Sequence, residues 1–211
     1  MKKILLMAGV AVFAFASNAN ALEVSPYVSA KLSYDWAKND VVMDAGEYGS
    51  EKIKYHKNLW GGHYAAGAKA GAIRAEVEWN HYKDAKRTIY GEGQKYRTRL
   101  QNNALLVNAY YDLNTCTPWT PYIGAGMGVA LLKFSYKDMN YGRKYSEKAH
   151  NFAWQVGAGV TYDLTKNIAL DGGYRYINAG AAVAQKGFDG NGKLKFDTAA
   201  HEIYLGARYT F

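Results

Sequence analysis

Residues 152–164 read FAWQVGAGVTYDL, a run in which two kinds of residue alternate without a break. From Phe152 to Leu164 every second side chain is apolar or aromatic, and the positions between them hold Ala, Gln, Gly, Thr and Asp. Successive side chains of a β-strand point to opposite faces, so this period of two predicts a strand with one apolar and one polar face.

The same alternation recurs along the chain and predicts eight strands. A content of 19 Tyr and only 3 Pro also favours sheet. The segments lie near 24–36, 61–71, 73–82, 101–113, 121–134, 151–164, 168–177 and 199–211.

Alternation alone does not separate a soluble sandwich from a membrane barrel, because either fold gives strands one apolar face. Two features favour the barrel. Aromatic residues gather near segment ends, as in membrane-interface girdles, and the polar face is rich in Gly, which suits a tight lumen. We therefore expect an all-β fold, an eight-stranded antiparallel up-and-down transmembrane β-barrel, with a soluble sandwich as the alternative.

The connections alternate in length. Those near 71–72, 114–120 and 165–167 are short, whereas 37–60, 83–100, 135–150 and 178–198 are long and predicted as loops. Short turns on one side and long loops on the other are the layout of outer-membrane barrels, which places both termini in the periplasm and the loops outside the cell. Ten strands remain the alternative if a long connection holds a further hairpin.

The first residues predict a secretory signal peptide. Lys2 and Lys3 precede the apolar run Ile4–Ala16, and Ala19 and Ala21 form an A-x-A cleavage pattern. The alternative is a membrane anchor, but the run is shorter than the roughly 20 residues that span a bilayer. We expect residues 1–21 to be removed and residues 22–211 to form one barrel domain.

The last residues, GARYTF at 206–211, carry a second signal. Gly206, Tyr209 and Phe211 form a G-x-x-aromatic-x-Phe ending, which resembles the assembly signal that the barrel insertion machinery reads in the last strand. The alternative is an amphipathic edge strand of a soluble sandwich.

NAYYDL at 108–113 and TPYIGAGMGVA at 120–130 resemble the centre of the small opacity-type outer-membrane barrels, which are related in architecture to the transmembrane domain of OmpA-like proteins. The resemblance covers the mature chain as a pattern and is specific in sequence only here and in the last strand. It implies an eight-stranded barrel whose surface loops serve adhesion, immune contact or envelope integrity. The chain ends at Phe211, where full-length OmpA-like proteins continue into a peptidoglycan-binding domain, so a wall-anchoring role is not expected.

The polar faces of the segments predict a charged lumen. Isolated charges there would be costly, whereas paired ones are tolerated, so we expect an ion-pair network that plugs the barrel. A narrow ion path through rearranged pairs is the alternative. The predicted network holds Lys31, Lys69, Arg74, Glu76, Glu78, Asp112, Asp171, Arg175, Glu202 and Arg208, and the same faces add Asp35, Gln155 and Asp163.

The long connections are basic and rich in tyrosine. A solvated surface is the plain interpretation, and contact with anionic groups is the sharper one: lipopolysaccharide phosphates near the rim, or sulfated or sialylated host glycans further out. The expected partners are thus outer-membrane lipids, lipopolysaccharide, and host surface glycans or proteins. The cations concerned are Lys86, Arg87, Lys95, Arg97, Arg143 and Lys144.

Other chemistry finds little support in the sequence. None of the five His is followed two residues later by the Ser expected of a barrel-type lipid A deacylase, and no cluster has metal-ligand spacing, so neither an enzyme nor a cofactor is expected. Nucleic acid is excluded by the compartment, although the chain carries a net charge of +8. The single Cys116 cannot form an internal disulfide, and we expect a monomer.

These observations predict a bacterial outer-membrane protein that acts at the cell surface through structural and adhesin-like binding. A narrow porin-like channel that conducts small ions or solutes is the alternative function.

Overall fold

The computed structural model describes residues 23–44, 50–91, 94–138, 144–184 and 193–211, and within these ranges the regular elements are β-strands. None of the described residues forms a helix long and apolar enough to cross a membrane. The predicted signal peptide with Ala19 and Ala21 lies outside the described residues and stays a prediction. The strands are β1 (Val24–Asp44), β2 (Ser50–Ala70), β3 (Ile73–Tyr82), β4 (Ala85–Gly91), β5 (Gln94–Asp112), β6 (Trp119–Asp138), β7 (Lys144–Asp163), β8 (Ile168–Ala184) and β9 (Lys193–Thr210).

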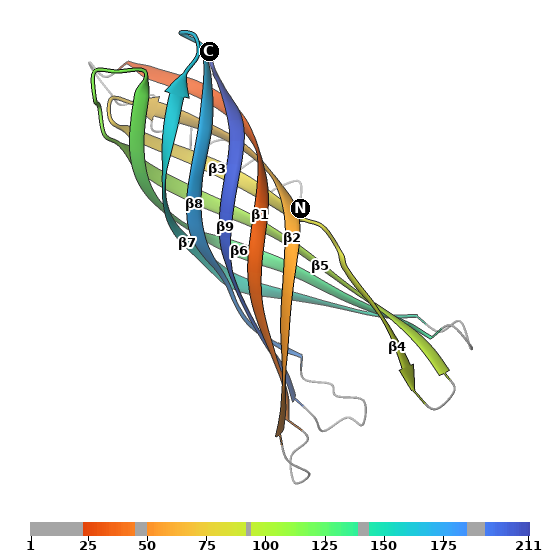
Figure 1. Cartoon of the computed structure of the whole chain (residues 1–211). Helices are drawn as coiled ribbons and strands as arrows, with labels where there is room; N and C mark the ends of the chain where they lie inside the picture. The colour runs from red at the N-terminus through yellow and green to blue at the C-terminus, as the bar shows by residue number, and fades with distance from the viewer. Residues whose placement is uncertain (1–22, 45–49, 92–93, 139–143, 185–192) are drawn as a thin grey trace.

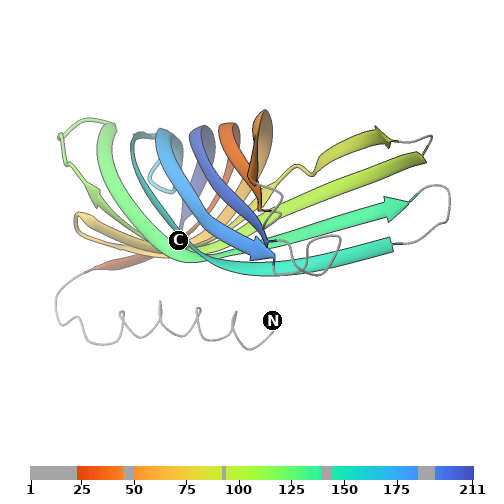
Figure 2. The same ribbon diagram turned by 90° about the horizontal axis from the view of Figure 1, so that it is seen from below.

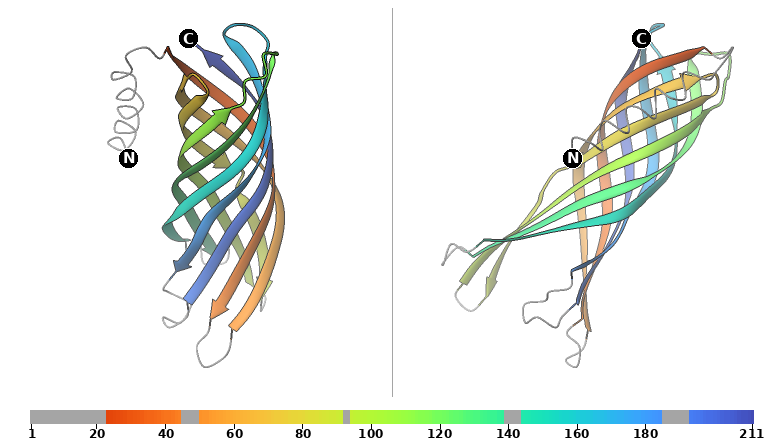
Figure 3. Two further views of the ribbon diagram at one scale, coloured as in Figure 1. Left: turned by 90° about the vertical axis from the view of Figure 1, so that its left-hand side faces the viewer. Right: turned by 180° about the vertical axis from the view of Figure 1, so that it is seen from behind.

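The described strands close into a barrel (Figure 1). Antiparallel pairing runs in the order β3-β2-β1-β9-β8-β7-β6-β5, and the pairing of β3 with β5 joins the two ends. β4 follows β3 after Lys83 and Asp84 and pairs with the same strand, β5, as Ala85 opposite Leu100 shows. β3 and β4 therefore occupy one position in the ring of strands, and the nine strands form an eight-stranded barrel. The predicted eight-stranded up-and-down barrel is confirmed. Figure 3 shows the strands winding side by side around it.

Three short connections lie at the same end of the barrel. They are residues 71–72, 113–118 and 164–167. β1 begins and β9 ends there as well, with Tyr27 opposite Thr210. This short-turn end therefore has the predicted layout, and in outer-membrane barrels such turns face the periplasm.

The prediction of four long loops is wrong for most of their length. The strands continue far into these segments, and Val41 still pairs with Ile53 and Tyr136 with Tyr145. Apolar alternation fades there because both faces of a strand outside the bilayer meet water, but the ladder of backbone hydrogen bonds does not need it. Only residues 45–49, 92–93, 139–143 and 185–192 of these connections lie outside the described residues.

The projecting strands divide into two separate sheets. Pairing of β2 with β3 stops at Gly61 and Tyr82, and pairing of β7 with β8 stops at Trp154 and Asn178. Beyond these points β4–β7 form one extension (residues 85–91, 94–102, 132–138 and 144–150). β8, β9, β1 and β2 form the other (residues 181–184, 193–198, 37–44 and 50–60). Figures 1 and 2 show the two extensions diverging.

Burial in the barrel is inverted relative to a soluble protein. The outward side chains of Leu32, Leu205 and Phe152 are 69%, 67% and 63% exposed. The inward carboxylates of Glu78 and Glu202 are 0% exposed. A soluble sandwich buries its large apolar side chains and leaves its charges in water, so that alternative is wrong and the apolar surface is the one that faces lipid.

Aromatic rings pack together near both ends of this apolar surface. Toward the extensions, Tyr34 lies 5.1 Å from the ring of Trp36, and Trp154 lies 5.5 Å from Tyr176. At the short-turn end, the Trp119 and Tyr162 rings are 4.5 Å apart. Two aromatic levels that border an apolar band are typical of a barrel anchored at both membrane interfaces.

Candidate functional site

Arg175 on β8 is the centre of the buried charge in the lumen. Its Nη1 donates to Glu78 Oε1 at 2.5 Å, and its Nε donates to Glu202 Oε1 at 2.7 Å. Its Nη2 donates to Asn80 Oδ1 at 3.1 Å. His63 Nε2 lies 3.1 Å from the same Glu202 oxygen. One guanidinium thus joins two carboxylates on different walls, as its fork of N–H donors allows.

Lys31 on β1 links this centre to Glu76. Its ammonium nitrogen lies 2.9 Å from Glu78 Oε2 and 3.2 Å from Glu76 Oε1. Glu76 also accepts hydrogen bonds from Tyr27 and Tyr110, each at 2.9 Å. The carboxylate of Glu76 is therefore held by four groups (the fourth is Asn108 at 3.2 Å), which offsets the cost of removing it from water.

A second group of charges lies nearer the short-turn end. Arg74 Nε donates to Asp112 Oδ1 at 2.8 Å, and the Lys69 ammonium lies 3.0 Å from Asp112 Oδ2. Arg208 Nη1 lies 3.6 Å from Asp171 Oδ2, and Asp171 accepts a hydrogen bond from Thr161 at 2.7 Å. The three cations at this level therefore share two carboxylates within the lumen, those of Asp112 and Asp171.

Tyrosine rings fill the space between the ion pairs. The Arg74 guanidinium lies 4.6 Å from the ring centre of Tyr122 and 4.9 Å from that of Tyr110. The Lys31 ammonium lies 5.5 Å from the ring of Tyr204, whose hydroxyl is 2.9 Å from that of Tyr122. Cation–π contacts of this kind hold cations without a further anion and occupy lumen volume.

Inward glycines make room for the long side chains. A Cβ at Gly157 of β7 would lie 2.7 Å from the Cβ of Arg175, and one at Gly67 of β2 would lie 2.7 Å from the Cβ of Glu76. These separations are shorter than van der Waals contact allows. The glycines on the polar face are therefore required by the bulk of the charged residues opposite them.

The lumen becomes apolar toward the extensions. Leu106, Ala104 and Ala130 are almost completely buried there. They pack in one cluster with Ala153, Ile177, Ala179 and Ala200. A polar lumen was expected throughout, so this plug of small apolar side chains was missed.

The ten predicted network residues fall into the two groups described, and Asp35 and Gln155 are also buried. Lys69 is the most exposed, with 39% of its side chain open at the short-turn end. Asp163 was expected in the lumen and is exposed instead, because β7 ends at that residue. Sequence reasoning missed His63 and the inward tyrosines. Strand parity could have found His63, which shares its face with Lys69.

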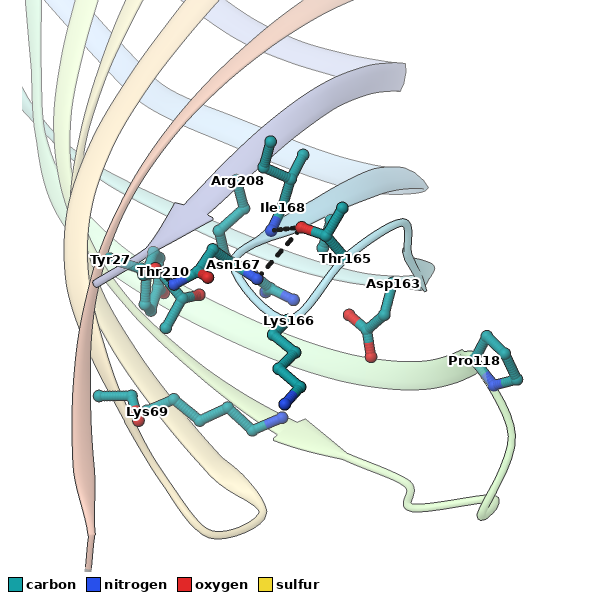
Figure 4. Close-up of a pocket in the computed structure, with 12 residues that line it drawn as sticks. Tyr27, Lys69, Pro118, Asp163, Thr165, Lys166, Asn167, Ile168, Arg208 and Thr210 are labelled. Carbon is teal, nitrogen blue, oxygen red and sulfur yellow. Dashed lines mark hydrogen bonds between the residues drawn. The ribbon is translucent and has the colours of Figure 1, made fainter.

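A cavity of about 420 Å³ opens at the short-turn end (Figure 4). Lys69, Lys166 and Arg208 contribute cations to its lining and Asp163 contributes a carboxylate. The turn beneath it is fixed by Thr165 Oγ1, which accepts hydrogen bonds from the backbone N–H groups of Asn167 and Ile168 at 3.2 and 2.9 Å.

The predicted assembly signal lies at this end. The backbone N–H of Phe211 donates to the carbonyl of Pro26 at 3.0 Å, and the rings of Tyr209 and Phe211 are 5.2 Å apart in an edge-on arrangement. A Cβ at Gly206 would lie 2.6 Å from Cγ of Lys31. Recognition by the insertion machinery stays a prediction.

The predicted loop cations lie mainly in strands of the β4–β7 extension. Arg97 is exposed on β5, next to Arg99, which forms an ion pair with Asp84. Four others belong to strands β4, β5 and β7, but only their backbone is described: Lys86, Arg87, Lys95 and Lys144. Arg143 lies outside the described residues.

Comparisons with known proteins place this architecture. The family described as "Outer membrane protein beta-barrel domain" matches residues 4–211. The outer membrane protein PagN of Salmonella typhimurium is 34% identical over 124 residues, which cover 54% of this chain and 52% of PagN. This chain thus spans about half the length of that relative. Opacity protein V28 of Neisseria gonorrhoeae is 27% identical and covers 88% of this chain and 97% of its own.

Solved structures agree on the fold. Neisserial surface protein A is 24% identical with a TM-score of 0.54, over 90% of this chain and 99% of that one. The outer membrane protein AlkL, solved in lipid bilayers, is 17% identical with a TM-score of 0.55, over 92% of this chain and 93% of its own. The resemblance to opacity-type barrels is confirmed, and the chain belongs to the outer membrane protein β-barrel domain family of the bacterial outer membrane.

Proposed function

We propose that this outer-membrane barrel is a cell-surface binding protein of the adhesin-like kind, which acts by binding rather than by catalysis. The observation that carries the proposal is the continuation of the strands into two sheets beyond the lipid-facing band. Strand pairing far outside the bilayer is not needed to anchor a barrel, but it does hold a surface in a defined position for a partner.

The charge of the β4–β7 extension supports an anionic ligand. In the β4–β7 extension cations outnumber acids, and the opacity-type resemblance implies adhesion through the same part of the barrel. Sulfated or sialylated host glycans supply anionic groups that Arg and Lys bind through charge-assisted hydrogen bonds. Its cations are Lys86, Arg87, Lys95, Arg97, Arg99, Lys133, Lys137, Lys144 and Lys148, against Asp138 and Glu147.

The filled lumen supports a binding role over the porin-like alternative. Arg175 and Glu78 meet across the barrel, and Leu106 with its alanine neighbours occupies the next level. Eight strands leave an interior that side chains can fill. We propose that the network acts as a plug and that the barrel does not conduct in its ground state.

Binding is tested with cells of a non-adherent strain that display the protein. Shortening the hairpin of β6 and β7, by removing residues 135–146, should abolish attachment to immobilised heparin or to sialylated glycans. The matched control removes residues 40–54 of the β1–β2 hairpin. The proposal is overturned if the β6–β7 deletion still folds, shown by a heat-dependent shift on gels, and attaches as well as the intact protein.

A further inference from the structure

We propose that the outward face of β5, β6 and β7, just beyond the lipid-facing band, binds the phosphate groups of lipopolysaccharide in the membrane that surrounds the barrel. This goes beyond the adhesin-like role, because the ligand is a lipid of the protein's own membrane. The surface is the membrane-proximal part of the same β4–β7 extension.

Pairing register assigns the residues to rows across the three strands. Val107, Met127 and Trp154 form one row, and Leu105, Val129 and Phe152 form the next. Both rows belong to the apolar surface, with Met127 and Phe152 62% and 63% exposed. Asn103, Leu131 and His150 follow as a mixed row. Beyond this row the same outward face of β5, β6 and β7 is basic instead of apolar.

Two of the rows beyond are cationic. The first holds Gln101, Lys133 and Lys148, and the third holds Arg97, Lys137 and Lys144. The row between them holds Arg99, Ser135 and Ser146, whose hydroxyls lie 3.5 Å apart on the exposed face. Lys148, Arg97 and Arg99 are exposed and Lys133 is half-buried. Arg99 already pairs with Asp84, so the cations that carry the proposal are Arg97, Lys133 and Lys148.

Like charges stand directly opposite one another in this sheet. Lys133 pairs with Lys148, Lys137 with Lys144, and Arg97 with Lys137. Directly opposed side chains have Cβ atoms about 5 Å apart, and like charges at that distance destabilise a sheet. An anion with several oxygen acceptors placed between the rows would turn this repulsion into attraction, and a phosphate is such an anion.

The distance of Lys133 and Lys148 from the apolar band favours a lipid as the ligand. Lys148 is four residues beyond Phe152 on β7, and Lys133 is four beyond Val129 on β6. At about 3.4 Å per residue and a strand tilt of about 40°, the ammonium row lies roughly 10 Å above the last strongly exposed apolar row. A lipid that covers Phe152 with its acyl chains would bring its phosphates to this level.

The opposite wall lacks this arrangement. In the β8–β2 extension Asp40 of β1 pairs with Asp197 of β9 and with Lys54 of β2. Among the described residues of this extension, no Lys or Arg is paired directly with another Lys or Arg, whereas Lys133 and Lys148 are paired directly on the β5–β7 side. The proposed lipid contact is therefore restricted to the β5–β7 side of the barrel.

The test uses the refolded full mature barrel in detergent. Its affinity for bisphosphorylated lipid A is measured by fluorescence against a variant that carries Arg97→Ala, Lys133→Ala and Lys148→Ala. The matched control removes three cations of the other extension, Lys38→Ala, Lys54→Ala and Lys195→Ala. We expect about tenfold weaker binding for the first variant and unchanged binding for the control. Heat-dependent gel mobility shows that both are folded.

Two further probes identify the ligand chemistry. Dephosphorylated lipid A should bind the intact barrel about as weakly as lipid A binds the triple variant, and inorganic phosphate at millimolar concentration should not compete. Equal losses in both variants, or full binding of the dephosphorylated lipid, would overturn the proposal. Attachment to glycans is scored separately with the hairpin deletions, so either proposal can fail alone.

Discussion

Arg175 and Glu78 form an ion pair across the full width of the barrel. They stand 97 positions apart in the chain and meet at 2.5 Å. β8 and β3 are four steps apart in the strand order in either direction around the eight-membered ring, so the two residues come from opposite walls. This one ion pair therefore links two opposite strands of the barrel through the middle of the lumen.

Replacing Arg175 with Met should destabilise the barrel strongly. The change leaves Glu78 and Glu202 buried without their common cation, and breaking a buried pair costs about 3–5 kcal/mol. Urea unfolding in lipid vesicles measures the loss. Lys69→Ala is the control, because its side chain is 39% exposed and Asp112 keeps Arg74. That variant should lose about 1 kcal/mol or less, and equal losses would contradict a special role for the central pair.

Opening the plug should create conductance. In the triple variant Arg175→Ala, Glu78→Ala and Leu106→Ala, both side chains of the cross-lumen ion pair and the largest fully buried side chain of the apolar level beyond it are shortened. No unpaired charge is left on Glu78. We expect discrete current steps in planar bilayers for this variant and a silent trace for the intact protein. Lys166→Ala, at the short-turn end, should stay silent. Steps of similar size in the intact protein would favour the porin-like function instead.

The glycines of the polar face give a steric test. A methyl group at Gly157 would lie 2.6 Å from the carbonyl oxygen of Tyr174 and 2.7 Å from the Cβ of Arg175. Because backbone cannot yield easily, Gly157→Ala should cost about 1–3 kcal/mol in the same unfolding measurement. Gly62→Ala is the matched control, since the nearest atom to its new methyl is 3.9 Å away. The idea fails if the two variants unfold at the same urea concentration.

Lipid contact is tested on the outward face of β1. Leu32 is 69% exposed near the middle of the apolar band, and Leu32→Lys should cost about 2–4 kcal/mol, the penalty for a cation near the bilayer midplane. The same substitution at the exposed Ser146, beyond the band, should change stability little. If Leu32→Lys were tolerated equally well in vesicles, the surface around it would not face hydrocarbon.

The sequence predicts those parts of the fold that follow from strand parity. Alternation within each segment assigns a face to Arg175, Glu78 and Glu202 because successive residues point to opposite sides. It fails in the run from Ala104 to Val107, where both faces are apolar and inward Leu106 is indistinguishable from outward Leu105. Strand parity also does not predict which inward residues contact one another. The contact between Arg175 and Glu78, for example, exists only because the strands close into a ring.

The extensions were beyond sequence reasoning for a different reason. Outside the bilayer both faces of a strand are wet, so the backbone ladder between β6 and β7 persists while the period-2 pattern disappears. Their basic character was readable as composition, but the rows that place Lys133 opposite Lys148 require the register.

The C-terminal residue provides a test that separates assembly from stability. Phe211 lies at the short-turn end with its ring 69% exposed and 5.2 Å from that of Tyr209, so its side chain supports few contacts within the barrel. If the insertion machinery reads this ending, Phe211→Ala should sharply reduce the amount of barrel in the outer membrane of cells, yet refold in detergent like the intact protein. Leu164→Ala is the control, because it removes an apolar side chain that is 51% exposed at the same end but outside the last strand. Normal assembly of the Phe211 variant in cells would contradict the predicted signal, whereas failure of both variants to refold would show that apolar contacts at this end stabilise the barrel itself.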